Sequence, residues 1–207
     1  MNYIKFFKYL AVIFLLCGAL DMSAATATEI MNKAARKAKS AQTISGTFSV
    51  TTSGKTFNGS LKASGSKFSF LTPLASSWYN GKNMWTYNAS SKETTLIIPT
   101  ASEIAESNPF EYLRTYNANY NATFSNKKIA GKYVIMLLPK SKRNTIKSVE
   151  VSLNGKTLKP ERFVITPRSG ASTTINVKSL EYSGAVKASE FEYPKNKYPD
   201  VQIIDLR

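Results

Sequence analysis

Histidine is absent from this chain of 207 residues, and cysteine occurs only once, as Cys17. The absence of histidine removes the usual general base of enzymes, the usual partner of a catalytic serine and the commonest zinc ligand. The carboxylates are few, and the pairs predicted to share a face, Glu103 with Glu106 and Glu190 with Glu192, lack apolar neighbours that would raise a pKa. These absences predict a protein that is not an enzyme and that holds neither a metal nor a cofactor.

The apolar run from Tyr9 to Leu20 is too short to cross a membrane comfortably. It follows Lys5 and Lys8, and small residues from Ser23 to Ala27 offer cleavage points after it, which is the pattern of a signal peptide. We therefore expect a cleaved signal peptide at residues 1–25, export, and one domain at residues 26–207.

Cys17 could be the acylated residue of a lipoprotein, but Leu15 and Leu16 precede it where a small residue is normal. Its interpretation as an apolar residue of the signal peptide is favoured. The mature chain then contains no thiol and no disulfide.

Acidic residues are outnumbered by basic ones, and the formal net charge is +15. Such a charge attracts anionic membrane surfaces, acidic partners or nucleic acid. The dense basic runs are Lys33 to Lys39 and Lys140 to Arg143. For an exported protein we favour transient contact with a membrane surface or an acidic partner and expect no nucleic acid, although solubility alone accounts for part of the charge.

One amphipathic helix is predicted from Thr28 to Ala41, with Thr28 as its cap and Glu29 at the positive end of its dipole. Its apolar stripe is mainly alanine, which permits close approach but gives little buried area. An ordinary packed helix and a movable cover both fit this pattern.

From Ile44 onward apolar residues recur with a period of two, which indicates strands. A central stretch, Ser77 to Leu113, begins as two strands joined at Asn80-Gly81, continues as a strand at Thr94 to Ile98, and ends in one short helical passage after Pro99. Further strands are predicted at 120–124, 132–138, 145–153, 157–166 and 171–182, and a last one carries Phe191 and Tyr193.

About ten or eleven strands in consecutive hairpins give a meander that curls. The predicted fold class is mostly β with α: an unclosed antiparallel β-barrel in which the N-terminal helix and the short internal helix act as a lid. A barrel that does not close leaves room inside for a ligand.

The side chains expected to line that interior are apolar and come from the first five strands, from the strand at Thr94 to Ile98 and from both helices. They are Ile30, Met31, Phe48, Val50, Phe57, Leu61, Phe68, Phe70, Trp78, Met84, Trp85, Leu96, Ile98, Ile104, Phe110 and Leu113. A closed core made of the same residues is the alternative.

The sequence resembles the periplasmic outer-membrane lipoprotein carriers, the LolA-like family, along essentially the whole predicted mature chain. The resemblance rests on an ordered set of short motifs: Gly46-Thr-Phe48, Phe57-Asn-Gly59-Ser-Leu61, Lys67-Phe68-Ser-Phe70, the Trp78 to Asn88 hairpin, Asn108-Pro109-Phe110, Tyr133 to Lys140, Asn154-Gly155, Ser183-Gly184 and Phe191-Glu-Tyr193-Pro194. The tail from Tyr198 to Arg207 resembles the form of the Bacteroidetes branch.

The resemblance implies a periplasmic carrier that binds the acyl chains of lipoproteins, or other lipids, in a hydrophobic cavity. It implies an inner-membrane ABC-type exporter as the donor and an outer-membrane acceptor, and we expect a monomer. Well-known members carry an arginine after the second strand that fastens the barrel to the lid. Here residues 62–67 contain none, and Lys62 and Lys67 are the possible substitutes.

Two alternatives remain open. The same fold could serve a periplasmic sensor or regulatory protein that binds the outer domain of a membrane protein. Acylation of Cys17 would instead make the chain a lipid-anchored outer-membrane acceptor.

Overall fold

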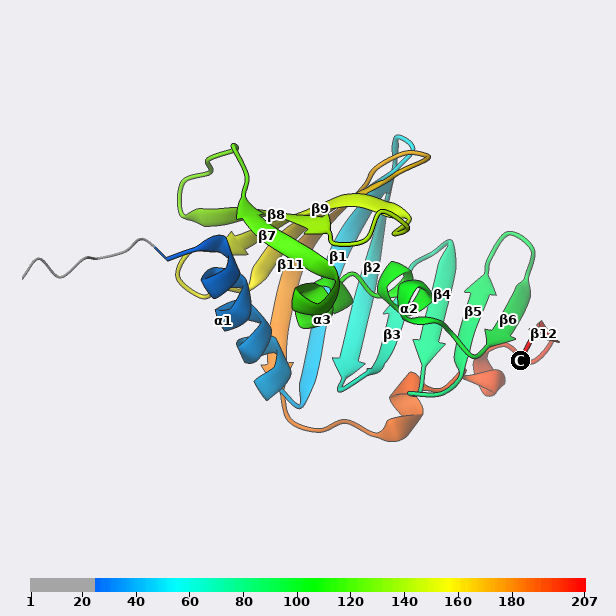
Figure 1. Ribbon diagram of the computed structural model, residues 1–207. Coiled ribbons are helices and arrows are strands. Elements are labelled where there is room, and N and C mark those ends of the chain that lie inside the picture. The colour runs from blue at the N-terminus through cyan, green and yellow to red at the C-terminus, as the bar shows by residue number, and fades with distance from the viewer. Residues whose placement is uncertain (1–24) are drawn as a thin grey trace, which may run out of the picture.

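The computed structural model describes residues 25–207, and its strands form one curled sheet (Figure 1). Twelve strands follow one another in the order β12-β6-β5-β4-β3-β2-β1-β11-β10-β9-β8-β7. Neighbours are antiparallel except for β12 and β6, and the end strands β12 and β7 do not pair. The prediction of a mostly β, unclosed antiparallel sheet with an N-terminal helix is confirmed, with twelve strands where ten or eleven were expected.

The elements follow the chain in this order, with η marking 3-10 helices. They are α1 (Ala27–Ser40), β1 (Thr43–Thr52), β2 (Lys55–Ser64), β3 (Lys67–Leu71), β4 (Ala75–Tyr79), β5 (Met84–Asn88), β6 (Glu93–Ile97), α2 (Ala101–Ser107), α3 (Glu111–Asn119), β7 (Tyr120–Phe124), β8 (Lys132–Pro139), β9 (Ile146–Asn154), β10 (Pro160–Pro167), β11 (Thr173–Ser183), η1 (Ala188–Phe191), η2 (Lys195–Lys197) and β12 (Gln202–Asp205).

The period-two pattern of β1 and β2 places their apolar residues on the concave face. In the antiparallel register Phe48 lies opposite Gly59 and Val50 opposite Phe57. Phe48 is 1% exposed, and its ring stacks on that of Phe70 in β3, with the centroids 4.4 Å apart. Gly59 has no Cβ, and this absence leaves room for the stack.

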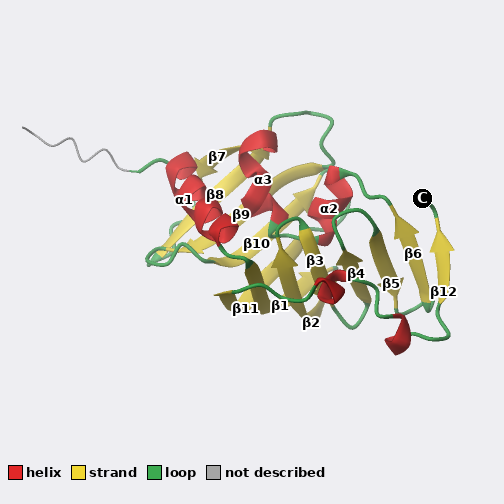
Figure 2. Ribbon diagram, turned by 90° about the horizontal axis from the view of Figure 1, so that it is seen from below, coloured by secondary structure: helices red, strands yellow, loops and turns green. Residues whose placement is uncertain are grey.

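The connection from β6 to β7 crosses the concave face from one end of the sheet to the other. It contains α2 and α3, which lie beside α1 over the curled sheet (Figures 1 and 2). The predicted single helical passage is wrong in this respect, because Asn108-Pro109 separates two helices and α3 continues to Asn119. A proline disfavours the helical conformation in the residue before it.

The N-cap of helix α1 lies two residues before the predicted one. Thr26, not Thr28, is the N-cap, and Glu29 completes a capping box with it. The alanine-rich stripe lies against the core as the 3.6-residue period requires: Ile30, Met31, Ala34, Ala35 and Ala38 are buried.

The C-terminal segment differs most from the prediction. Phe191 lies in η1 rather than in a strand, and β12 pairs parallel with β6 at the edge of the sheet. The segment returns along the convex face, where Tyr193 and Tyr198 pack edge-on against Trp78 at centroid distances of 5.5 and 6.0 Å. A second apolar cluster therefore lies on the face opposite the three α-helices.

The predicted signal peptide and Cys17 lie outside the described residues, apart from Ala25. Within residues 25–207, no helix is long and apolar enough to span a membrane.

We predict that Gly59→Ala destabilises the fold, because an added Cβ would lie 2.5 Å from both the Leu71 carbonyl oxygen and the Phe48 ring. Overpacking of this kind costs about 1–3 kcal/mol of unfolding free energy, to be measured by urea denaturation. Gly184→Ala is the control, since the nearest atom to its Cβ is 3.9 Å away. Equal effects from the two changes would contradict this account of the Phe48–Phe70 stack.

Candidate functional site

The concave side contains an apolar hollow, here called the sheet pocket, with a volume of about 420 Å³. It lies between the ends of β1, β3, β10 and β11 on one side and Pro109 and Tyr112 on the other. Its lining consists of Val50, Phe70, Pro109, Tyr112, Thr145, Ile146, Ile165, Pro167, Ser169, Ala171, Thr173 and Ile175. Val50, Phe70 and Ile165 are only half-buried, so the apolar wall is accessible.

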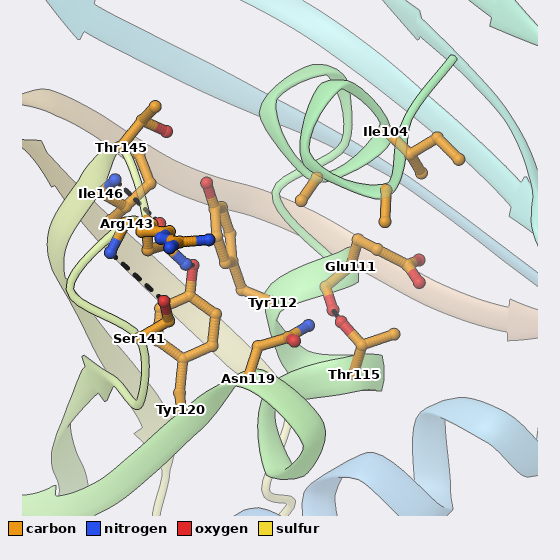
Figure 3. A pocket seen from close by; sticks show the side chains of 13 residues that line it. Ile104, Glu111, Tyr112, Thr115, Asn119, Tyr120, Ser141, Arg143, Thr145 and Ile146 are labelled. Atoms are coloured by element: carbon orange, nitrogen blue, oxygen red, sulfur yellow. Dashed lines mark hydrogen bonds between the residues drawn. The ribbon is translucent and has the colours of Figure 1, made fainter. Parts of the chain in front are cut away.

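A second hollow of about 410 Å³, here called the helix pocket, adjoins the first. Figure 3 shows its lining from α2, α3 and the loop between β8 and β9. Tyr112, Thr145 and Ile146 line both pockets and form the wall between them. Ile104 supplies an apolar surface from α2, whereas Glu111 and Arg143 bring the charged groups of this lining.

The three helices that cover the sheet are held very differently. Helix α1 contributes Met31, which is 0% exposed, and α3 contributes Leu113 and Tyr112, which are 1% and 2% exposed. By contrast, every α2 side chain that the structure describes is half-buried or exposed. Because buried apolar area supplies most of the adhesion between elements, α2 is the most weakly attached cover of the hollow.

Helix α3 is fastened to its surroundings by polar contacts at several points. The Arg114 guanidinium donates to the Gly65 carbonyl in the turn between β2 and β3. The Tyr116 hydroxyl donates to Asn32 Oδ1 at 2.6 Å, which joins α3 to α1. From the other side, Lys140 Nζ donates to the Asn117 carbonyl at 2.6 Å.

These contacts identify which cation fastens the helices to the sheet. Of the two lysines proposed from the sequence, Lys62 pairs with Glu190 of η1 at 2.8 Å, on the convex side. The contact with the β2–β3 turn is made from the helix side, by Arg114. No sequence pattern indicated this arrangement, because Arg114 lies 49 positions after Gly65.

Among the described residues, Glu111 is the one carboxylate that lines the helix pocket, and its side chain is 13% exposed. Burial raises its pKa, while the charges of Arg114, 3.3 Å away, and of Lys39 lower it. The net shift of the pKa is upward because desolvation of the carboxylate is the largest effect.

The structure brings part of the predicted lining set to the pockets. Val50 and Phe70 line the sheet pocket, and Ile104 lines the helix pocket. Eight others lie deeper, in the main core that α1 and α3 form with the sheet: Ile30, Met31, Phe48, Leu61, Phe68, Met84, Phe110 and Leu113. They form the packed floor beside the hollow rather than its open wall.

The remaining predicted residues lie elsewhere. Trp78, Trp85 and Leu96 belong to the second apolar cluster, on the convex face with Tyr193. The reason is that side chains alternate between the two faces of a strand. In β4, Ser77 and Tyr79 face the helices, so Trp78 between them faces the convex side. Phe57 is half-buried beside Val50, and Ile98, just beyond β6, is 60% exposed.

Sequence reasoning missed the half of the lining that comes from the later strands and from α3. Ile175 alternates with Thr174 and Asn176 in β11, which was a usable signal, whereas Ile165 follows Val164 in an apolar run of β10. Tyr112 carried no such signal, because its place depends on the long crossing between β6 and β7. Ile146 is the first residue of β9, where no alternation precedes it.

The chemical character of the two pockets follows from their lining. Among residues 25–207, no group of three or more His, Cys, Asp or Glu side chains is placed to hold a metal ion. The pockets instead present apolar walls with hydroxyl and amide groups at their rims. Such a lining suits an apolar ligand with a polar end.

Comparison with protein families gives a match over residues 18–171 to the family described as outer membrane lipoprotein carrier protein LolA. The chain belongs to this family. A comparison with curated proteins found no match.

A solved structure of low sequence identity shares this fold. An uncharacterized conserved protein from Thermus thermophilus aligns with a TM-score of 0.57 at 12% identity, covering 86% of this chain and 98% of that one. A putative outer membrane lipoprotein-sorting protein domain from Vibrio parahaemolyticus aligns at 14% identity with a TM-score of 0.45, over 82% and 97% of the two chains. A LolA superfamily protein from Nitrosomonas europaea aligns at 13% identity with a TM-score of 0.42, over 82% and 99%.

We predict that Arg114→Gln raises the pKa of Glu111 further, because it removes the larger of the two charges that favour the carboxylate. A raised folded-state pKa stabilises the fold below the unfolded pKa, and this stability is lost as pH rises through the folded pKa. The variant should therefore lose more stability than the wild type across that interval. Side-chain ¹³C NMR titration measures the pKa; an unchanged or lower value would contradict the assigned cause.

Proposed function

We propose that this protein is a periplasmic carrier that binds the acyl chains of lipoproteins in the concave hollow and moves them between the inner and outer membranes. The observation that carries the proposal is the sheet pocket, an unfilled apolar volume of about 420 Å³ that adjoins the helix pocket lined by the weakly attached helix α2. Membership of the lipoprotein-carrier family supports the same function.

The size of the hollow suits such a ligand. Small-molecule sites usually occupy about 300–1,000 Å³, and the two adjoining pockets measure about 420 and 410 Å³. At about 0.8 kcal/mol per CH₂, one long acyl chain exposed to water costs on the order of 10 kcal/mol. A carrier must bury most of the apolar surface of the chain and still release it. Walls that are only partly buried before binding suit such reversible binding.

Helix α2 is the element that we propose moves when a chain enters. It contributes Ala101, Ile104 and Ala105 to the helix pocket and has no buried side chain among those described. The segment Asn108-Pro109 would act as the hinge, because α3 beyond it stays fastened through Arg114 and Tyr116. Displacement of α2 would widen the helix pocket on the side that Ile104 lines, next to the sheet pocket.

The partners follow from this role and are part of the proposal. An inner-membrane ABC-type exporter would load the carrier, and an outer-membrane acceptor would receive the lipoprotein. The ligand itself is an acylated lipoprotein or another lipid with long chains. The sequence pattern of residues 1–25 supports export to the periplasm.

We predict that Val50→Glu weakens the binding of a fluorescent acylated peptide about tenfold or more. The substitution places a carboxylate in the apolar wall, where it must lose hydration or exclude the chain. Ser49→Glu is the matched control, since it adds the same charge to the adjacent residue of β1, which faces the other side of the sheet. Fluorescence titration measures both affinities, and equal losses would end the assignment of the sheet pocket.

We also predict that Arg114→Gln speeds release of the acylated peptide several-fold. The substitution removes the donor to the Gly65 carbonyl, so α3 can move with α2 and the hollow opens more often. Arg207→Gln is the control, because the contacts of that guanidinium are with Asp205 at the C-terminal strand. Stopped-flow measurement of probe release would contradict the proposal if both variants matched the wild type.

A further inference from the structure

Two adjacent turns form a projecting basic surface at the end of β7, β8, β9 and β10, here called the basic tip. It consists of residues 124–132, between β7 and β8, and residues 154–159, between β9 and β10. The β7–β8 loop projects at the upper left of Figure 1, at the opposite ends of these strands from the hollow.

The basic tip is an ordered structure rather than a loose loop. The amide of Gly155 donates to the Gly131 carbonyl at 2.8 Å, which joins the two turns. Within the first turn, the amide of Ser125 donates to the Val134 carbonyl at 2.9 Å, and that of Lys132 to the Ile129 carbonyl at 3.1 Å. Side chains on this frame therefore keep a fixed presentation.

Two large apolar side chains of the tip are exposed to solvent. Phe124 is 47% exposed and Ile129 is 42% exposed. Phe124 keeps one side against the ring of Tyr133, with the centroids 6.4 Å apart, and offers the rest of its surface to a partner. Their position on a projecting tip suits insertion into a soft, apolar surface.

The carboxylates near the tip are already paired, so its remaining charge is positive. Glu150 pairs with Lys127 at 2.9 Å, and Glu161 pairs with Lys132 at 2.7 Å. Lys128 and Lys156 are exposed and form no ion pair with any residue in the described part of the chain.

The basic surface continues from the tip onto α1. Lys37 Nζ donates to the Thr157 carbonyl at 3.1 Å, which places this helix beside the second turn. Lys33 and Arg36 are further exposed cations of the same helix.

We propose that the basic tip docks on the surface of an anionic lipid bilayer. Phe124 and Ile129 enter the interface between headgroups and acyl chains, while Lys128 and Lys156 contact the anionic headgroups. Exposed apolar side chains together with lysines are the combination that binds anionic bilayers, since burial of apolar area and electrostatic attraction add. Because the exposed lysines are positively charged, the tip should bind an anionic bilayer more tightly than a neutral one.

This docking is independent of the hollow. The sheet and helix pockets lie at the β8–β9 and β10–β11 loops, at the other ends of the strands that carry the tip. A protein held by its tip keeps the mouth of the hollow away from the bilayer, where a partner protein can reach it. The acylated-peptide test of the hollow and the vesicle test of the tip therefore fail or succeed separately.

The test is co-sedimentation of the mature protein with vesicles. One preparation contains equal parts of phosphatidylcholine and phosphatidylglycerol, and the other contains phosphatidylcholine alone. We expect binding to the anionic vesicles that weakens with added salt, and at least tenfold weaker binding to the neutral ones.

The apolar part is tested with the double variant Phe124→Ser/Ile129→Ser. We expect its affinity for anionic vesicles to fall about tenfold or more, because both inserted side chains are lost. Its control is Leu74→Ser/Leu138→Ser, which changes side chains that are 51% and 43% exposed away from the tip. Thermal melts by circular dichroism establish that each variant is folded before binding is compared.

The charge is tested with Lys128→Gln/Lys156→Gln. Each lysine removed near an anionic surface should weaken binding about fivefold. Lys55→Gln/Lys82→Gln makes the same change in net charge at exposed positions away from the tip.

Three outcomes would overturn the proposal: equal binding to both kinds of vesicle, equal losses in tip and control variants, or an absence of vesicle binding. Self-association of the wild type that Phe124→Ser/Ile129→Ser abolishes would also overturn it, since a second copy would then be the occupant of the tip.

Discussion

The crossing between β6 and β7 is the constraint on which the rest of the structure depends. The chain builds its sheet outward from β1 to β6 and then resumes at β7, the opposite end strand. Because the sheet is curled and does not close, the shortest route between these ends crosses the concave face. The residues of that route must cover apolar surface, and they do so as α2 and α3 (Figure 2). A cover made from a connection, rather than from a strand of the sheet, can be displaced without breaking any strand pairing.

The interior is tightly packed along one part of this crossing and loosely packed along another, and the hollow lies in the loosely packed part. Beneath α1 and α3, large side chains such as Met31, Phe68 and Phe163 are completely buried and fill the space. The α2 side chains that line the helix pocket are alanine and a half-buried isoleucine, and in the adjoining sheet pocket Val50, Phe70 and Ile165 are only half-buried, so this apolar wall is left incompletely covered. Such an interior combines a core that stabilises the fold with an apolar wall whose burial is left to a ligand.

The sequence predicted the positions of the strands better than the side of the sheet to which their aromatic side chains point. Period-two alternation located the strands closely because it is a local property, and the prediction for β7, Tyr120 to Phe124, agrees with the structure at both ends. The face to which each strand turns its aromatic residues was harder, since Trp78 and Tyr79 are adjacent aromatics that point to opposite sides. Which side is concave depends on the curl of the whole sheet and on the C-terminal segment that covers Trp78 and Trp85. The same reason explains the missed contact of Arg114 with Gly65, because no local pattern joins positions so far apart in the chain.

The positions of charge and of apolar surface suggest a division between the two ends of the sheet. At one end, the pockets have apolar walls, and the charged groups of their lining are Glu111, which pairs with the nearby Arg114 at 3.3 Å, and Arg143. At the other end, Glu150 and Glu161 are paired within the fold. The lysines beside them therefore give this end a positive electrostatic potential. In the proposed docking these lysines attract the anionic surface, and the exposed Phe124 and Ile129 distinguish the tip from the basic β8–β9 loop at the other end. The β8–β9 loop at the pocket end is also basic, with Lys140, Lys142 and Arg143 exposed, but no charged side chain lines the sheet pocket, so an apolar ligand can enter there without displacing strongly bound water.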